Sequence, residues 1–325
     1  MTEREAPRPA VSVGDILSSG PATGSADGSP EDDLRLVAGA GGLRRAISSA
    51  VARKPGLALA GEHEALDPGS VQVLGRSEMA FMAQAAPAAR RELIERLGRS
   101  PVACLVLSHG AVLPPDLAQA AEAHKLPVLS TRLASDAVIE RLGRRLEERL
   151  APSVVVHGTL IDIYGVGVLM LGESGIGKSE SALELILRGH RLVSDDVVSV
   201  RRFGALLNGT GPEVSRFHME LRGIGIINIK DLYGVAAVRE RKDLDLVVKL
   251  DPWQAGKDYE RLGLDDATYP LLGVHVPFIE LPVRPGRNVS ILLEVAARHL
   301  LLRSRGYHPA RELAERIQQA LGKPG

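Results

Sequence analysis

The chain has little cysteine, no net charge and no long apolar run. Cys104 is the only cysteine in 325 residues, so neither an internal disulfide nor a cysteine-rich metal site is expected. The 40 basic side chains balance the 40 acidic ones, which argues against a protein that coats nucleic acid or an anionic membrane. No stretch approaches the roughly 18 apolar residues of a membrane-spanning helix, and the first ten residues lack the apolar core of a secretory signal. These absences predict a cytoplasmic protein with no membrane or nucleic-acid partner.

The length and the pattern of apolar residues predict two α/β domains. At roughly 150 residues per domain, 325 residues suggest two. Residues 1–132 alternate short apolar runs with helical stretches such as Ser77–Leu97, which predicts a small N-terminal α/β domain, with a flexible Gly/Ser-rich insertion near residues 20–30. Residues 133–152 contain a charged amphipathic helix, Ser135–Leu150, which we expect to connect the domains. Residues 153–325 form the second domain.

The second domain is expected to contain a mixed sheet flanked by helices. Apolar runs at Val166–Leu171 and Leu192–Val200 predict strands, and the spacing of apolar residues predicts helices at Lys178–Arg188 and Val289–Arg303. A glycine-rich segment lies between the strand Val166–Leu171 and the helix that follows it. A strand, a glycine-rich turn and a helix in this order are typical of phosphate-binding loops.

This turn carries the strongest chemical signal in the chain. It fits the pattern G-x-x-x-x-G-K-S with the residues Gly172, Glu173, Ser174, Gly175, Ile176, Gly177, Lys178 and Ser179. Glycines let successive backbone N–H groups converge on phosphate oxygens, and the helix N-terminus adds positive potential. The lysine would neutralise the β- and γ-phosphates, and the serine hydroxyl would bind Mg²⁺. The sequence therefore predicts a nucleotide-binding P-loop.

Further polar residues could complete the site. Asp195 and Asp196 stand in an apolar run 17 and 18 residues after Lys178, where carboxylates serve Mg²⁺ or a reacting hydroxyl, although capping or turn formation would also explain an Asp pair. His157 ends a Val-rich strand, a position more typical of a structural histidine. Glu220 and Arg222 precede two glycines in a polar loop or simple turn. Arg284 and Arg287 flank a rigid turn before a helix, which suits phosphate capture but also fits a solvated basic turn.

With these residues in view, the chain resembles the bifunctional HPr kinase/phosphorylase family. The resemblance covers nearly the whole length. It includes the run from His157 through Asp196, MELRGIGIIN at 219–228, YERLGLD at 259–265 and VRPGRN at 283–288. In the first half, VSVGDIL, KPGLALAGE, VQVLGRSE and the region around LPVLST are similar to the family's N-terminal domain. The chain departs from the family in the insertion near residues 20–30 and at Ser194, where a small apolar residue is usual. Neither departure removes a chemical group.

The resemblance implies an enzyme that uses ATP and Mg²⁺ to phosphorylate a serine of the phosphocarrier protein HPr or a homologue. The same site would use inorganic phosphate to dephosphorylate phosphoseryl-HPr and release pyrophosphate, in a homohexamer. His157, Lys178, Asp196 and Arg261 match the family's active-site positions, and residues 172–179 match its nucleotide loop. Ser179 and Glu220 match its Mg²⁺ ligands. Segment 219–228, with Arg222, matches one important for both reactions, and 283–288, with Arg284 and Arg287, one tied to dephosphorylation.

The chemistry leaves two points open. Either Asp196 or Asp195 could take the serine proton in one direction and return it in the other, because microscopic reversibility lets one carboxylate serve both. Other classes of function also fit a P-loop: an ATPase or small-molecule kinase without a protein substrate, or a nucleotide sensor without catalytic activity.

Overall fold

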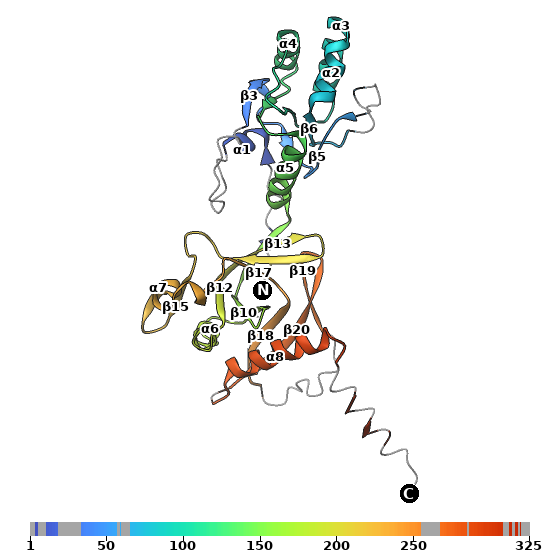
Figure 1. Ribbon diagram of the computed structural model, residues 1–325. Coiled ribbons are helices and arrows are strands. Elements are labelled where there is room, and N and C mark those ends of the chain that lie inside the picture. The colour runs from blue at the N-terminus through green and yellow to red at the C-terminus, as the bar shows by residue number, and fades with distance from the viewer. Residues whose placement is uncertain are drawn as a thin grey trace. The chain divides into compact units, whose positions relative to one another are not determined.

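The protein consists of two compact units with both helices and strands, which confirms the α/β prediction (Figure 1). The computed structural model describes residues 4–5, 11–18, 34–56, 59, 66–254, 267–284, 286–307, 312–313, 316–317 and 319. We call Pro7–Ala151 the N-terminal unit, and Met1–Ala6 with Pro152–Gly325 the C-terminal unit. The expected insertion near residues 20–30 lies outside the described residues. In the described part of the chain, no helix has the length and apolar character needed to cross a membrane.

A five-stranded sheet in the order β3-β8-β7-β6-β5 forms the centre of the N-terminal unit. Four strands are parallel, namely β5 (Ala52–Arg53), β6 (Val71–Leu74), β7 (Cys104–Leu107) and β8 (Val128–Ser130), while β3 (Arg35–Ala38) is antiparallel to β8. A separate two-stranded ladder joins β2 (Val11–Ser12) and β4 (Ala46–Ile47), and a short 3-10 helix, η2, spans Ala40–Gly42. The central strands β6, β7 and β8 are almost entirely buried because helices cover both of their faces.

Helices lie on both sides of this sheet. One apolar core joins the sheet to α2 (Arg76–Gln84), α3 (Pro87–Arg99) and α4 (Pro115–Ala123). A second core joins the opposite face to α1 (Val13–Ser18) and α5 (Ser135–Leu150). The helix α5 contributes Val138, Leu142 and Leu146 to that core, so it belongs to the N-terminal unit, and the units divide between Ala151 and Pro152.

The helical stretch expected over Ser77–Leu97 is helical but is divided into two helices. The helix α2 ends at Gln84, Ala85 and Ala86 are extended with ψ of 147° and 148°, and α3 begins at Pro87. A proline disfavours helical backbone in the residue before it and cannot donate an N–H group to a preceding turn. Pro87 therefore starts a new helix rather than continuing α2.

Two stacked sheets and one helical layer make up most of the C-terminal unit. An antiparallel sheet has the order β1-β9-β13-β14-β17, formed by β1 (Arg4–Glu5), β9 (Ser153–His157), β13 (Val197–Phe203), β14 (Leu206–Thr210) and β17 (Arg241–Asp243). A mixed sheet has the order β12-β10-β11-β18-β20-β19, formed by β12 (Arg191–Ser194), β10 (Thr159–Ile163), β11 (Val166–Leu171), β18 (Leu246–Pro252), β20 (Val274–Val283) and β19 (Thr268–Leu271).

The layers bury two apolar cores. One lies between the two sheets and includes Val156, Leu171 and Val247. The other lies between the mixed sheet and two helices, α6 (Lys178–Leu187) and α8 (Val289–Arg303). Figure 1 shows both helices on the side of the mixed sheet that faces away from β13. Of the six strands, β11, β18 and β20 are mutually parallel, so their carboxyl ends meet at one edge.

The strand expected over Leu192–Val200 is also wrong. The segment forms two strands in different sheets, β12 in the mixed sheet and β13 in the antiparallel sheet. Asp195 and Asp196 make the turn between them, and Asp196 has a φ of 63°, which aspartate tolerates better than most residues. The turn places both carboxylates where the two sheets meet.

A small subdomain projects from this unit beside α6 (Figure 1). It contains a hairpin of β15 (His218–Leu221) and β16 (Gly225–Asn228), the short helix α7 (Ile229–Tyr233) and a 3-10 turn, η5 (Val235–Ala237). Asn228 caps α7 by accepting the N–H groups of Lys230 and Asp231. Met219 and Leu221 anchor the hairpin to the core shared with α6.

Candidate active site

The glycine-rich segment forms a tight loop between the end of β11 at Leu171 and the start of α6 at Lys178. Three glycines take positive φ angles, 149° at Gly172, 84° at Gly175 and 100° at Gly177, which side chains other than glycine rarely adopt. The Lys178 ammonium donates hydrogen bonds to the carbonyls of Gly172 (2.9 Å) and Glu173 (3.0 Å). The lysine side chain therefore spans the loop, and these contacts hold its ammonium group close to the point where the helix begins.

The start of α6 has the properties of an anion site. Its N-cap residue, Gly177, has no side chain that could occupy the first backbone N–H groups. These groups, the helix dipole and the Lys178 ammonium all favour a bound phosphate. The expected nucleotide residues, 172–179, lie together in this one loop and the first turn of α6.

Asp195 lies directly behind the loop. Its carboxylate accepts hydrogen bonds from the Ser179 hydroxyl, at 3.1 Å for Oδ1 and 2.9 Å for Oδ2, and from the Thr159 hydroxyl, at 2.7 Å. Only 8% of Asp195 is exposed, and this burial raises the pKa of its carboxyl, while the hydrogen bonds from Thr159 and Ser179 lower it. The structure thus brings together Ser179 and Asp195, and it adds Thr159, which sequence reasoning missed. The only signal for Thr159 was a hydroxyl residue placed between His157 and a buried strand.

Asp196 differs from its neighbour in environment. Its side chain is exposed, and its backbone carbonyl accepts the N–H group of Gly158 at 3.0 Å. His157 ends β9 and pairs in register with Val197, the residue after Asp196. Both His157 and Asp196 are therefore exposed at the same corner of the two sheets, beside the buried Asp195.

The β15–β16 hairpin contributes an arginine to the loop. Arg222 donates from Nη2 to the Ser174 hydroxyl at 3.3 Å. A Cβ at Gly175 would come within 2.6 Å of the Arg222 guanidinium, so a side chain at this position would displace the guanidinium from its present place. Glu220 is exposed on β15, two residues before Arg222.

The structure does not bring every expected residue to the loop. In the described part of the chain, no hydrogen bond or ion pair joins Arg284 or Arg287 to residues 172–179. The Arg284 guanidinium lies 5.3 Å from the centre of the Trp253 ring, and Arg287 donates to the Pro282 carbonyl at 3.1 Å. Arg261 lies outside the described residues.

The residues behind the loop fit Mg²⁺. The ion prefers hard oxygen ligands, and the Ser179 hydroxyl and Asp195 carboxylate offer these within hydrogen-bond distance of each other. Burial destabilises the charged form of Asp195, and a cation would relieve that cost. No group of three His, Cys, Asp or Glu side chains in the described ranges could hold a metal ion alone. A divalent ion at this place would therefore need oxygen ligands from a bound phosphate or water as well.

Two family models match the chain. The family described as HPr Serine kinase C-terminal domain matches residues 148–317, and the one described as HPr Serine kinase N terminus matches residues 29–146. Among solved structures, the HPr(Ser) kinase/phosphatase from Coxiella burnetii is 35% identical, with a TM-score of 0.44 over 49% of this chain and 97% of that chain.

Curated relatives match over most of the chain. A protein of Geobacter sulfurreducens named HPr kinase/phosphorylase is 46% identical over 286 residues, covering 88% of this chain and 90% of the relative. A protein of Exiguobacterium with the same name is 42% identical over 289 residues, covering 89% and 93%. Because these matches span most of the chain and of each relative, the chain belongs to the HPr kinase/phosphorylase family.

Proposed function

We propose that the chain phosphorylates a serine of the phosphocarrier protein HPr or a homologue with ATP, and that the same site reverses the reaction with inorganic phosphate. The choice of HPr as the acceptor protein rests on the family, because the relatives are named HPr kinase/phosphorylase. The observation that carries the chemistry is the contact of Ser179 with the buried Asp195, directly behind the phosphate loop. That contact joins a metal-binding pair to an anion site, which phosphoryl transfer requires.

The loop residues would bind the nucleotide. Backbone N–H groups of residues 172–177 and the N-terminus of α6 would surround the phosphates of ATP, and Lys178 would turn from the loop carbonyls to the β- and γ-phosphates. Ser179 and Asp195 would hold Mg²⁺, with Glu220 as a further ligand suggested by the family, and the ion would neutralise phosphate charge. Arg222 would support the loop through Ser174.

Asp196 is the better candidate for the base. Asp195 already accepts from two hydroxyls and is buried, whereas Asp196 is exposed to an incoming protein. In the kinase direction the serine oxygen would bond to the γ-phosphorus, the bond to ADP would break, and the hydroxyl proton would pass to Asp196. In the reverse direction an oxygen of inorganic phosphate would attack the phosphoserine phosphorus, the serine oxygen would leave with a proton from Asp196, and pyrophosphate would form. His157, exposed beside Asp196, would assist in orienting these groups, and Arg261 would add charge, as the family suggests.

Transfer of labelled phosphate tests the proposal. The purified chain is mixed with Mg²⁺, γ-labelled ATP and HPr, and with an HPr variant in which the acceptor serine is alanine. We expect labelled phosphate on HPr but not on the alanine variant. We also expect release of pyrophosphate when phosphoseryl-HPr and inorganic phosphate are supplied. ATP hydrolysis without label on HPr would instead support an ATPase or small-molecule kinase, and ATP binding without any turnover would support a nucleotide sensor.

The remaining expectations belong to the same proposal. We propose a homohexamer that acts in the cytoplasm, where HPr and ATP would both be available. Exposed apolar side chains on α8, Ile291 and Val295, offer surface that another copy could cover.

A further inference from the structure

A cavity of about 400 Å³ lies in the N-terminal unit, whereas the phosphate loop belongs to the C-terminal unit. Its walls are the helix α2, the start of α3 and the connection from β7 to α4. The side chains that line it include Met79, Met82, Arg90, Ala111 and Pro114. Cavities of about 300–1,000 Å³ enclose small molecules in proteins, so this one has room for a small ligand.

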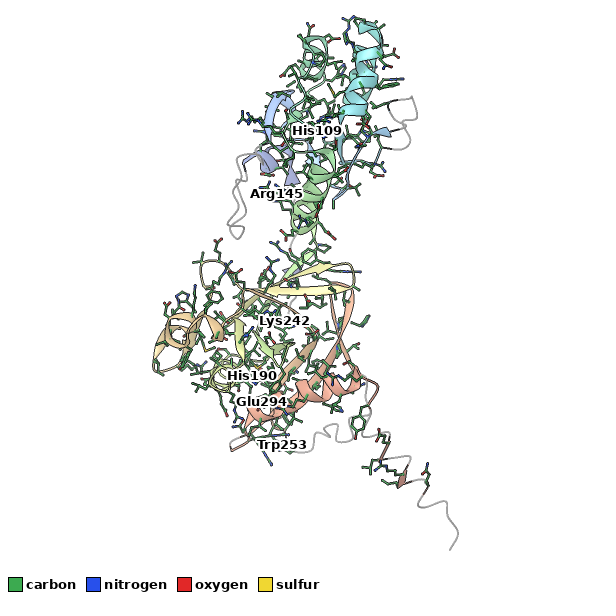
Figure 2. All side chains as sticks on the ribbon, in the orientation of Figure 1. His109, Arg145, His190, Lys242, Trp253 and Glu294 are labelled. Carbon is green, nitrogen blue, oxygen red and sulfur yellow. The ribbon has the colours of Figure 1, made fainter. Side chains whose placement is uncertain are left out.

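The cavity lies at the edge of the sheet where the parallel strands end. The helix α2 follows β6, and the connection to α4 leaves β7 through His109, which is labelled in Figure 2. The chain after β7 leads to α4 on one face of the sheet, and the chain after β8 leads to α5 on the other face. Open α/β sheets bind ligands beyond the carboxyl ends of their strands, at such a change of face. The position of the cavity therefore favours a binding site.

Most of the cavity wall is apolar. Met82 is 2% exposed and belongs to the core formed with α2, α3 and α4, and Met79 and Ala111 pack against that core. The thioether side chain of methionine is flexible and polarizable, so it adapts to apolar ligands of different outline. The wall thus fits the apolar body of a ligand.

Arg90 of this wall belongs to a charged pair with incomplete hydrogen bonding. Its Nη2 atom lies 3.4 Å from Oδ2 of Asp116, and the two side chains are 20% and 29% exposed. Arg90 Nε and Asp116 Oδ2 are nevertheless buried atoms, and neither has a hydrogen-bond partner within the part of the chain that the structure describes. A buried donor without an acceptor, or a buried acceptor without a donor, costs free energy that a bound polar group would recover.

The two atoms need opposite partners. The Arg90 Nε–H group requires an acceptor, and the Asp116 oxygen requires a donor. A carboxamide supplies both, because its oxygen accepts and its NH₂ group donates. A carboxylate would satisfy Arg90 but would be repelled by Asp116, and an ammonium group would do the reverse. A water molecule would satisfy the pair but would leave the apolar wall without a partner.

We propose that the N-terminal unit binds, in this cavity, a small neutral molecule with an apolar body and a carboxamide group. The apolar body lies against Met79 and Met82. The carboxamide oxygen accepts from Arg90 Nε, and the NH₂ group donates to Asp116 Oδ2. This site uses none of the residues assigned to phosphoryl transfer, so the inference goes beyond the proposed function and does not depend on it.

Methionine methyl resonances in an NMR titration test the proposal. Met79 and Met82 line the cavity, whereas Met170 and Met219 lie in the core of the C-terminal unit and serve as internal controls. The full-length protein, with isotope-labelled methionine methyl groups, is titrated at neutral pH with hexanamide, hexanoate and hexylamine, which carry different polar groups on similar chains. We expect saturable shifts at Met79 and Met82, no shift at Met170 and Met219, and binding of hexanamide about ten-fold tighter than that of the other two compounds.

Two substitutions separate the polar contact from the cavity itself. Asp116→Asn removes the charge that repels a carboxylate, so the preference for hexanamide over hexanoate should fall by about ten-fold. Ala111→Leu fills the cavity and should abolish binding of all three compounds. The matched control is Ala118→Leu, because Ala118 packs against the same core outside the cavity lining, and this variant should bind hexanamide like the wild type. Cooperative thermal unfolding verifies that each variant is folded.

Three results would overturn the inference. One is the absence of saturable shifts at Met79 and Met82, which would mean that water alone occupies the cavity. Another is equal affinity for the three compounds, which would show that Arg90 and Asp116 do not select the ligand. The third is undiminished binding in Ala111→Leu, which would place the bound molecule elsewhere.

Discussion

Replacing Thr159 with valine should expose how the site keeps a charged carboxylate in a buried place. Valine preserves the shape of threonine but removes the hydroxyl that donates to Asp195 at 2.7 Å. A hydrogen bond to a charged group contributes about 1.5–3 kcal/mol. Because this hydrogen bond lowers the pKa of Asp195, its loss should raise that pKa further. At neutral pH we therefore expect the free energy of unfolding of the C-terminal unit to fall by about 1.5–3 kcal/mol.

The effect has a defined dependence on pH. Burial already raises the pKa of folded Asp195 above its ordinary value of 3.8. Between the unfolded and folded pKa values the folded state binds more protons, so stability declines as pH rises through that window. Thr159→Val raises the folded pKa of Asp195 further, so the pH range over which stability declines extends to higher pH. The difference from wild type should be smallest at low pH, where Asp195 is protonated in both proteins, and should reach its full size only above the raised pKa.

Urea unfolding monitored by Trp253 fluorescence, repeated from about pH 4 to pH 8, measures this difference for the unit that contains the site. Thr159→Ser is the matched control, because it keeps the hydroxyl and loses one methyl group. It should cost about 0.5–1.5 kcal/mol with little dependence on pH. If Thr159→Val destabilised the protein by the same amount at every pH, the hydroxyl would not be acting through the charge of Asp195, and the reasoning would be refuted.

Four further predictions concern other parts of the molecule. Lys178→Ala should abolish both directions of catalysis, because ATP and inorganic phosphate would share one loop; near wild-type HPr phosphorylation would contradict this. Asn288→Ala should lower the free energy of unfolding by about 0.5–2 kcal/mol, because Asn288 caps α8 and also donates to Glu184 at 2.8 Å. Calorimetry would detect the loss. Cys104, whose burial raises the pKa of its thiol to about 12, should react with a thiol reagent only after denaturation; rapid labelling of the native protein would disagree. Light scattering should give the mass of a hexamer, and a monomer across micromolar concentrations would remove that proposal.

The parts of the fold that depend on local signals could be predicted from the sequence. Strand β11 and helix α8 have the bounds that the pattern of apolar residues predicted, and the loop between β11 and α6 follows from the spacing of its glycines. The division of Leu192–Val200 between two sheets could not be predicted, because an apolar run is the same whether one sheet or two bury it.

The site contacts that the sequence did not predict join residues that are far apart in the chain. Thr159 reaches Asp195 because β10 pairs with β12, which brings together two residues that are 36 positions apart in the sequence. Arg284 meets Trp253 because two parallel strands end in register. Neither contact produces a pattern in the sequence, whereas the motif formed by their immediate neighbours identifies Lys178 and Ser179.

The pairing of β1 with β9 affects the order in which the chain can fold during its synthesis. Arg4 and Glu5 lie opposite Val155 and Val154, so the first strand must wait for a partner made about 150 residues later. At about 5–20 residues per second, that delay is roughly 8–30 s. The N-terminal unit, which is continuous in sequence, can fold on the ribosome in the meantime. A truncated protein that starts at Pro152 would lack β1 and leave the outer edge of β9 open to pairing with other chains, so the loss of Arg4 and Glu5 would expose the C-terminal unit to aggregation.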